Sequence, residues 1–370
     1  MIHDIVIIGA GMAGASLAAE LGGRGRILLI EAEEQPGYHA TGRSAAFWNE
    51  TYGGPAVQPL TTASGPWLAK PPIDVSPHGF LSPRGALHLA GYGDEGLLDR
   101  MVATFGDAVR LEPLDRAALT RAVPGLRDEI RRGVFEPSCQ DIDVAGLHAA
   151  CLAKARRTGV AIRCRAPVVA MTRHAGIWHL QIRDGSMIKA DVVVNAAGAW
   201  ARSIGTLAGA TPIAIAPLRR TMVQLALASP VPASLPLVID IAGRFYFKPD
   251  THGRLWVSPH DETPAEAGDA APEELDIALA IDRLERTVDW TVVAKERAWA
   301  GLRSFAPDRA PVYGPDPKAA GFFWFAGQGG FGIQTAPAAA MIGAALLADD
   351  RLPDAVSDID LDPYSPSRFS

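Results

Sequence analysis

The feature that most constrains this chain is a β-branched run followed at once by three closely spaced glycines near the N-terminus. We expect a strand at Asp4–Ile8, a turn at Gly9–Gly14, a helix over about Ala13–Leu21 and a second strand at Arg26–Ile30, which Glu31 follows. Glycines permit a tight turn and the close approach of a pyrophosphate, while a helix start offers unpaired N–H groups. A carboxylate at Glu31 can accept hydrogen bonds from ribose hydroxyls, so this unit predicts a dinucleotide site that suits either NAD or FAD.

The same G-x-G-x-x-G spacing occurs twice more, but neither match predicts a second Rossmann unit. At Gly91–Gly96 the loop contains Asp94 and Glu95, which would repel a phosphate, so we interpret it as a turn before a helix. At Gly327–Gly332 the loop follows an apolar strand pattern, Gly321–Ala326, and precedes a final helix close to the C-terminus. A loop at that helix start could stabilise negative charge on a reduced flavin.

Bulk composition argues against several other classes of protein. The 370 residues suffice for a sizeable core, and the formal net charge of −6 disfavours nucleic acid as the main partner. Three cysteines without CxxC or histidine spacing predict incidental thiols and no metal site. No GxSxG, HExxH or GK[ST] motif supports a hydrolase or an NTPase. With no basic leader and no apolar stretch long enough to span a bilayer, we expect a cytoplasmic protein.

Features typical of nucleotide-binding domains occur at the start, middle and end of the chain, with other material between them. The later elements that we expect are helices at Glu95–Phe105, Asp143–Arg157 and Glu273–Thr287, and strands at Val168–Arg173, Ile177–Ile182 and Ile188–Val194. We therefore predict an α/β protein with a discontinuous, Rossmann-like cofactor domain comprising residues 1–80, 140–208 and 310–370. An α+β substrate domain with a mixed sheet is inserted as residues 81–139 and 209–309.

Three segments together resemble the D-amino acid oxidase (DAO) family of flavoproteins, which includes glycine and sarcosine oxidases and bacterial D-amino acid dehydrogenases. They are the Gly9–Gly14 loop with Glu31, the segment Gly37–Ala46, and Val192–Trp200, which ends in Asn-Ala-Ala-Gly-Ala-Trp. The stretch Trp299–Arg303 and the run Ala326–Thr335 add to the resemblance, and all of these segments lie in order across nearly the whole chain. Within the family, the chain is most similar to the bacterial D-arginine dehydrogenase group. The resemblance implies an oxidoreductase with noncovalent FAD.

The resemblance also implies which residues hold FAD. They are Gly9, Gly11, Met12, Ala13, Gly14, Glu31, Thr41, Gly42, Arg43, Ser44, Ala45, Ala46, Val168, Ala197, Gly198, Trp200, Arg303, Gly329, Gly330, Gly332, Ile333 and Gln334. Among them, Ser44–Ala46 should pass close to the flavin and its phosphates. Gln334 should lie at the start of the last helix, beside the flavin ring.

For the substrate, the resemblance implies a clamp for a carboxylate. Arg303 and Arg220 match the family's carboxylate-binding arginines, and a guanidinium binds a carboxylate in a bidentate fork. Tyr246 would add a hydroxyl donor, and Tyr52 lies in a segment that resembles the family's active-site lid. The carbonyl oxygen of Gly330 resembles the acceptor for the substrate amine.

Two positions depart from the family pattern and fall in the specificity pocket. Ala86 stands where the D-arginine dehydrogenase group has an acidic residue, and Phe47 stands where a histidine is expected. Without a buried carboxylate, a cationic substrate side chain would lose its hydration uncompensated, at a cost of several kcal/mol. We therefore expect neutral, apolar D-amino acids to be preferred.

The expected reaction transfers a hydride from the substrate Cα to flavin N5, and the imino acid product hydrolyses to a 2-oxo acid and ammonia. The carboxylate clamp orients the substrate and no side-chain base is nominated, so His39, His148 and His260 are interpreted as structural or exposed. The alternatives are a glycine, sarcosine or cyclic secondary amine oxidase, a 2-hydroxy acid dehydrogenase and a non-catalytic flavoprotein subunit. The electron acceptor stays open among oxygen, a quinone and another carrier.

Overall fold

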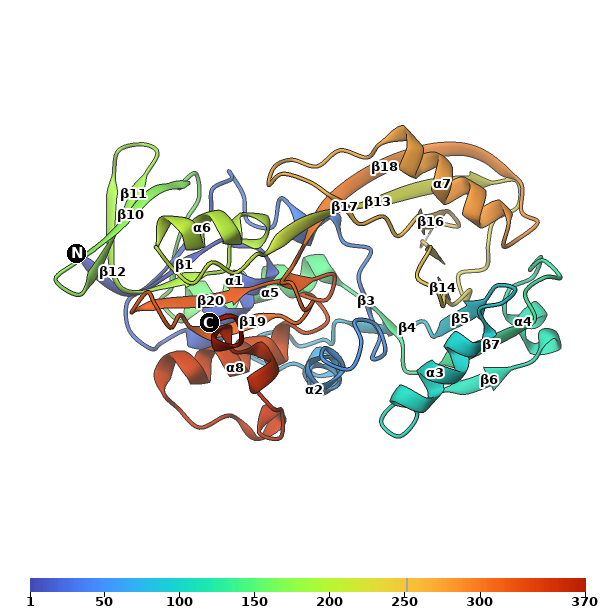
Figure 1. Cartoon of the computed structure of the whole chain (residues 1–370), viewed down its shortest axis with the longest axis horizontal. Coiled ribbons are helices and arrows are strands. Elements are labelled where there is room, and N and C mark those ends of the chain that lie inside the picture. The colour runs from blue at the N-terminus through green and yellow to red at the C-terminus, as the bar shows by residue number, and fades with distance from the viewer. Residues whose placement is uncertain (251) are drawn as a thin grey trace.

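The computed structural model describes residues 1–250 and 252–370, which form two parts that are each built around one large sheet (Figure 1). The first part contains β1 (Ile2–Ile8), α1 (Met12–Leu21), β2 (Ile27–Ile30), η1 (Ala40–Arg43), α2 (Gln58–Ala69), α5 (Val144–Arg157), β9 (Ala161–Arg163), β10 (Val168–His174), β11 (Ile177–Ile182), β12 (Met187–Asn195), η2 (Gly198–Trp200), α6 (Ala201–Leu207), β19 (Val312–Pro315), β20 (Phe322–Ala326) and α8 (Ala336–Ala348). The chain ends in three short 3-10 turns, η3 (Asp354–Val356), η4 (Asp362–Tyr364) and η5 (Pro366–Phe369).

The second part holds the other large sheet and its helices. It contains β5 (Ala86–Ala90), α3 (Glu95–Phe105), β6 (Glu112–Leu114), α4 (Arg116–Ala122), β7 (Arg132–Glu136), β13 (Ala216–Leu227), β14 (Leu237–Asp240), β15 (Tyr246–Pro249), β16 (Leu255–Ser258), β17 (Thr263–Pro264), α7 (Glu274–Glu285), β18 (Val292–Phe305) and β21 (Gln328–Gly329). A small sheet of β3 (Phe47–Trp48), β8 (Gln140–Ile142) and β4 (Leu81–Pro83) lies between the two parts in the chain's path.

The first sheet is parallel at its centre, as the N-terminal pattern predicts. β1 pairs in parallel with β2 on one side and β12 on the other, and β20 continues the parallel run beyond β12. Strands of such a sheet are covered on both faces, which explains the uninterrupted apolar run of β1. Side chains of α1, α5 and α8 pack in one apolar cluster with β1. Side chains of β10, β11, β12 and α6 contribute to a second apolar cluster.

The second sheet has an outer face, which packs against α7, and an inner face, which is turned toward the first part. Its long strands β13 and β18 pair antiparallel along their whole length and reach back toward the first part (Figure 1). Alternate residues form the outer core, where Leu87, Val223 and Phe247 pack with the buried side of α7. The intervening residues, among them Ala86 and Tyr246, form a separate apolar cluster on the inner face. That inner face supplies the candidate site.

The predicted α/β fold is confirmed, and so is most of its local structure. Asp143 caps α5 by accepting a hydrogen bond from Gly146 N (2.9 Å), and Gly185 makes the β11–β12 turn with a φ of +87°. The Gly91–Gly96 loop is a turn between β5 and α3, as we expected. The two large sheets draw their strands from the segments that the predicted domains assign to each, except that β21 comes from the last predicted segment of the cofactor domain and pairs with β18 of the second sheet. The domain boundaries themselves stay a prediction.

The Gly327–Gly332 loop lies between β20 and the final helix, as expected, with further turns between Gly332 and Ala336, where α8 begins. Within the loop, Gly329 pairs with Ser304 at the end of β18. Its φ is +54°, and a Cβ there would lie 2.2 Å from the Phe305 ring, so glycine is required by packing against β18.

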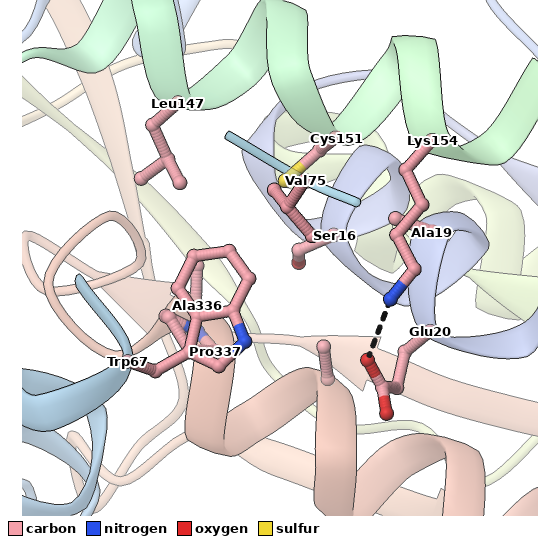
Figure 2. Close-up of a pocket in the computed structure, with 11 residues that line it drawn as sticks. Ser16, Ala19, Glu20, Trp67, Val75, Leu147, Cys151, Lys154, Ala336 and Pro337 are labelled. Carbon is pink, nitrogen blue, oxygen red and sulfur yellow. Dashed lines mark ion pairs between the residues drawn. The ribbon is translucent and has the colours of Figure 1, made fainter. Parts of the chain in front are cut away.

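The described residues also show whether membrane-spanning helices, metal-binding clusters, disulfides and cavities are present. No helix in this part of the chain is long and apolar enough to span a membrane, and no cluster of His, Cys, Asp or Glu could hold a metal ion. The three cysteines are free. A cavity of about 20 Å³ lies beside Trp67 and Cys151, edged by the Lys154–Glu20 ion pair (Figure 2). It has room for about one water molecule, and none of the predicted site residues lines it.

Candidate active site

The glycine loop before α1 is packed so closely that two of its positions require glycine. Gly9 has a φ of +101°, and a Cβ there would lie 2.5 Å from the carbonyl oxygen of Ala196, which follows β12. A Cβ at Gly14 would lie 1.9 Å from the carbonyl oxygen of Gly9. Gly11 precedes α1, whose first turn contains no acidic side chain. A pyrophosphate can therefore approach this helix start without steric or charge conflict.

Polar side chains from distant segments hold the same loop. Glu31 Oε2 accepts a hydrogen bond from Ala10 N, and Thr41 Oγ1 accepts one from Met12 N, each at 2.9 Å. His148 on α5 binds the carbonyl oxygen of Ala10 through Nε2, also at 2.9 Å. Burial lowers the pKa of His148. The histidine is structural, as expected, but no motif indicated that it supports the glycine loop.

The other residues implied to contact FAD lie mostly on segments that meet near this loop. Val168 begins β10, close to where Ala166 N binds the carbonyl oxygen of Glu31 at 2.8 Å. Trp200 in η2 lies 4.6 Å from His39, measured between ring centroids. The remainder are Ala13 at the start of α1, Gly42 in η1, Ser44, Ala45 and Ala46 before β3, Ala197 and Gly198 after β12, Gly329 in β21, and Gly332 and Ile333 before α8.

The Arg43 side chain has a structural role that the sequence did not indicate. Its guanidinium donates to the carbonyl oxygens of Ala270 and Ala300, each at 3.0 Å, and pairs with Asp269. Trp299 Nε1 donates to the carbonyl oxygen of Arg43 at 2.9 Å. These bonds fasten the segment before β3 to β18, so the predicted contribution of Arg43 to FAD falls to its backbone.

Gln334 is likewise engaged with protein. Its Nε2 donates to the Tyr52 carbonyl oxygen at 3.0 Å and to Thr61 Oγ1 at 2.9 Å, and its Oε1 accepts from Asn49 N at 3.3 Å. The buried amide therefore anchors the segment that carries Tyr52. Gln334 directly precedes Thr335, the N-cap of α8, and its position beside the flavin ring stays a prediction.

The predicted carboxylate clamp is assembled around Arg303. Its Nη1 lies 2.7 Å from the Tyr52 hydroxyl, and its Nη2 lies 3.5 Å from the Tyr246 hydroxyl. A Cβ at Gly330 would lie 2.7 Å from Arg303 Nη1, so a larger residue there would displace the guanidinium. Among the described residues, no carboxylate lies within ion-pair distance of Arg303. The site thus presents a partly buried cation that lacks an anion.

The adjacent arginines of β13 have different surroundings because successive strand residues face opposite sides of a sheet. Arg220 lies on the inner face, diagonally across from Arg303, and is buried. Its Nη2 pairs with Glu262 at 3.1 Å, while Nη1 has no hydrogen-bond partner among the described residues. Burial and the positive charge of Arg303 lower the pKa of Arg220. Arg219 faces the other way and pairs with Asp276 of α7 at 2.9 Å.

Aromatic rings close the site around the clamp. Phe47 lies 5.1 Å from Tyr52 and 5.8 Å from Tyr246, measured between ring centroids, with both pairs edge to face. Phe331 lies 5.4 Å from Tyr52, and His260 lies 5.7 Å from Tyr246. The sequence analysis did not nominate Phe331, and His260 was expected to be structural or exposed. The structure places both in the candidate site.

The Ala86 pocket is apolar, but a buried carboxylate lies on the neighbouring strand. Ala86 is fully buried and pairs with Glu136 on β7, so the expectation that no acid lies near this pocket is wrong. Glu136 accepts hydrogen bonds from Glu50 N (2.9 Å), Thr51 Oγ1 (2.6 Å) and His88 Nε2 (3.2 Å). Burial raises the pKa of Glu136, but these bonds outweigh burial and the net shift is downward. The carboxylate thus stays charged and holds the segment that carries Tyr52 through these hydrogen bonds.

Comparison with known proteins identifies the family to which this site belongs. A family model described as DAO, FAD dependent oxidoreductase, matches residues 4–346. The chain belongs to the DAO family. Mitochondrial dimethylglycine dehydrogenase of Rattus norvegicus is 26% identical over 365 residues, and the match covers 89% of this chain but 41% of that protein. Glycine oxidase of Pseudomonas aeruginosa is 28% identical over 405 residues, with 99% of each chain covered.

A structural comparison shows that the fold is shared with a solved glycine oxidase. The crystal structure of glycine oxidase from Geobacillus kaustophilus superposes with a TM-score of 0.83 at 23% identity, and 98% of each chain is covered. The chain spans less than half the length of the first curated relatives, so their activities do not transfer directly. The finer similarity to D-arginine dehydrogenases stays a prediction.

FAD is the cofactor of this DAO family chain. The residues present fit it, because glycine at positions 9, 11 and 14 leaves the backbone at the start of α1 without side chains that would keep a pyrophosphate away. Glu31 and the start of α1 supply a carboxylate for ribose and N–H groups for phosphate. No charged side chain of the loop opposes a dinucleotide there.

Proposed function

We propose that this DAO family chain oxidises the C–N bond of a small amino acid of the glycine, sarcosine or cyclic secondary amine type. The observation that supports this most is the Arg303 guanidinium, which has no carboxylate partner among the described residues and lies between two tyrosine hydroxyls. A substrate carboxylate satisfies that charge in a bidentate fork. The unpaired Nη1 of Arg220 offers a further donor on the same face.

The aromatic residues around the clamp favour a small substrate. Phe47 lies edge to face with both Tyr52 and Tyr246, whose hydroxyls flank Arg303, so bulky rings surround the proposed position of the substrate carboxylate. The names of the similar proteins, glycine oxidase and dimethylglycine dehydrogenase, also denote amines that carry a small carboxylate. These observations favour the glycine type over larger D-amino acids.

A second candidate is the oxidation of neutral, apolar D-amino acids, as the sequence analysis predicted. It is favoured by the apolar cluster that Ala86, Leu237 and Ile239 form with Tyr246. Glu136 does not supply a free counter-charge there, because three donors already occupy its oxygens. A cationic side chain would therefore remain unpaired in this pocket.

In either reaction the chain's own groups orient the substrate. Arg303 holds the carboxylate and Tyr246 and Tyr52 flank it, while Gly330, a residue close to the Arg303 guanidinium, offers its carbonyl oxygen to the amine. FAD supplies the hydride acceptor when bound. The aromatic rings exclude water from the substrate.

Anaerobic mixing of the FAD-loaded protein with a substrate panel tests the proposal. The panel contains glycine, sarcosine, dimethylglycine and proline, together with D-methionine, D-leucine, D-phenylalanine and D-arginine. The proposal predicts the fastest loss of flavin absorbance with one of the first four. Faster reduction by an apolar D-amino acid would support the second candidate, and no reduction by any compound would contradict both. Repeating the best pair with oxygen and with a quinone identifies the electron acceptor.

A further inference from the structure

The position of His260 shows that this residue does more than fill space beside the clamp. It follows β16 in a left-handed conformation with a φ of +55°, which is unusual for a residue other than glycine. Such conformations concentrate at functional sites, where the surrounding structure holds them in place. Its Nε2 lies 3.3 Å from the hydroxyl oxygen of Tyr52, which in turn binds Arg303.

The direction of each hydrogen bond in this chain of groups can be assigned. The carbonyl oxygen of Gly243 binds His260 Nδ1 and can only accept, so Nδ1 must carry a proton. In neutral His260, Nε2 is therefore an acceptor, and the Tyr52 hydroxyl donates to it. Arg303 Nη1 can only donate, so the same tyrosine oxygen accepts from Arg303. One lone pair of the Tyr52 oxygen remains for the substrate.

An amino acid held by Arg303 brings its amine close to that lone pair. The amine and the carboxylate are attached to the same carbon, so the amine lies within hydrogen-bond reach of groups that flank Arg303. Tyr52 and Gly330 are such groups. Amino acids bind from neutral water as ammonium ions, whereas oxidation of the C–N bond requires the neutral amine. A proton must therefore leave the substrate within the site.

We propose that His260 takes up this proton through the hydroxyl of Tyr52. The substrate ammonium transfers a proton to the Tyr52 oxygen as the Tyr52 hydroxyl proton passes to His260 Nε2. The substrate becomes a neutral amine, Tyr52 remains a neutral phenol and His260 becomes an imidazolium, so charge is conserved. His260 acts as a positioning and proton-accepting residue behind Tyr52. The inference rests on the proposed function, because it requires an amino acid at Arg303.

The charges around these groups are compatible with the transfer. Burial raises the pKa of Tyr52, but Arg303 and Arg220 outweigh it and shift that pKa below its ordinary value, which eases proton passage. The groups packed against His260 are the Tyr52 and Tyr246 rings and the Gly243 carbonyl. Among the described residues, no charged side chain forms an ion pair with His260.

Charged groups also lie on the elements next to His260. Arg283 of α7 donates to the carbonyl oxygen of Pro259, while Arg220 and Arg309 pair with Glu262 on the following residues of the loop. Arg283 is already protonated and has no ion pair among the described residues, while both oxygens of Glu262 accept hydrogen bonds from Arg220 or Arg309, so neither group takes the proton in place of His260.

The pH dependence of flavin reduction distinguishes this role from simple packing. We expect His260→Ala to reduce flavin about a hundredfold more slowly than wild type at pH 7, the scale of one general-base contribution. The loss should disappear above the pKa of the free substrate ammonium, where the amine already arrives neutral. Added imidazole should restore part of the rate at pH 7. His174→Ala, which changes an exposed histidine on β10, is the matched control.

A double-variant comparison tests whether His260 acts through Tyr52. Tyr52→Phe should show the same loss at pH 7, and His260→Ala should add little to it, because both changes break one path. Equal losses at every pH, no recovery with imidazole, or additive losses in the double variant would each overturn the inference.

A second readout needs no turnover and separates this inference from the proposed function. 2-Aminoisobutyrate has an amine and a carboxylate but no Cα hydrogen, so it can bind without being oxidised. Calorimetry in HEPES and in Tris should show no net proton release on binding to wild type, since His260 retains the proton, and release of up to one proton with His260→Ala. Equal proton release from both proteins would refute the relay. If the two proteins differ in proton release as expected but no amino acid reduces the flavin, the proton transfer to His260 is supported and the proposed function is contradicted.

Discussion

Replacement of Glu136 should weaken the site by releasing the segment that carries Tyr52. Glu136 is fully buried and accepts hydrogen bonds from Glu50 N, Thr51 Oγ1 and His88 Nε2. Glu136→Ala leaves three donors without an acceptor, and each buried donor without a partner costs about 1–3 kcal/mol. Because neighbouring groups can rearrange, we expect the free energy of unfolding to fall by about 3–5 kcal/mol. Glu136→Gln keeps the volume but turns an amide nitrogen toward donors, and should cost about 2 kcal/mol.

The functional effect of the Glu136 change should fall mainly on KM. Two of the lost hydrogen bonds come from Glu50 and Thr51, which directly precede Tyr52, whereas the hydrogen bond from Gln334 Nε2 to the Tyr52 carbonyl oxygen remains. If the Tyr52–Arg303 hydrogen bond is weakened by about 1.4 kcal/mol, the KM rises about tenfold. Steady-state kinetics and urea unfolding of the FAD-loaded proteins measure both effects, with the exposed Glu129→Gln as control.

The pH dependence of stability gives the same prediction an independent check. The pKa of Glu136 is lowered in the folded protein, so its contribution is complete above the unfolded value of about 4.3 and disappears as the pH falls through the folded value. The stability difference between wild type and Glu136→Gln should therefore be constant near neutrality and shrink in acid. An unchanged KM together with unchanged unfolding at pH 7 would refute the role that we give to Glu136.

Three further changes test other parts of the site. Gly14→Ala places a Cβ 1.9 Å from a backbone oxygen and should yield protein without FAD by absorbance, whereas Gly96→Ala, with open space around it, should keep full occupancy. Arg303→Lys loses the two-pronged fork and should raise the KM about a hundredfold, roughly 3 kcal/mol, while Arg219→Gln on the opposite face should leave it unchanged in the same assay. Gly330→Ala would press on Arg303 Nη1 from 2.7 Å, so its KM should also rise while flavin content by absorbance stays normal. An unaltered KM in either variant, or FAD retained by Gly14→Ala, would contradict the corresponding assignment.

The parts of the fold that follow from local sequence were predicted well. The β1–α1–β2 unit depends on β-branched residues, a glycine turn and an apolar helix in immediate succession, and all of these are visible in the sequence. The helix α5 and the β11–β12 hairpin have their own start and turn residues, Asp143 and Gly185. The packing of Gly329 against β18 was not predicted, because it depends on pairing between strands that are distant in sequence.

The site was predicted where the family motif gives a side chain and its role together. Arg303, Tyr246 and Tyr52 come together as the resemblance implied. The roles of Glu136 and His260 could not be predicted, because they depend on strand register and on loops that are distant in sequence. A guanidinium or an amide can bind protein or ligand equally well, so only the folded contacts reveal that Arg43 and Gln334 bind protein.

Removing only the carboxylate from the substrate tests the central claim most directly. The best amino acid of the panel and the amine that lacks its carboxylate, such as sarcosine and dimethylamine, are mixed anaerobically with the FAD-loaded protein. Because Arg303 has no anion among the described residues, we predict that the amino acid reduces the flavin while the amine is at least about a hundredfold less effective, the equivalent of roughly 3 kcal/mol. Equal reduction by both compounds would contradict the claim that a carboxylate bound to Arg303 positions the substrate.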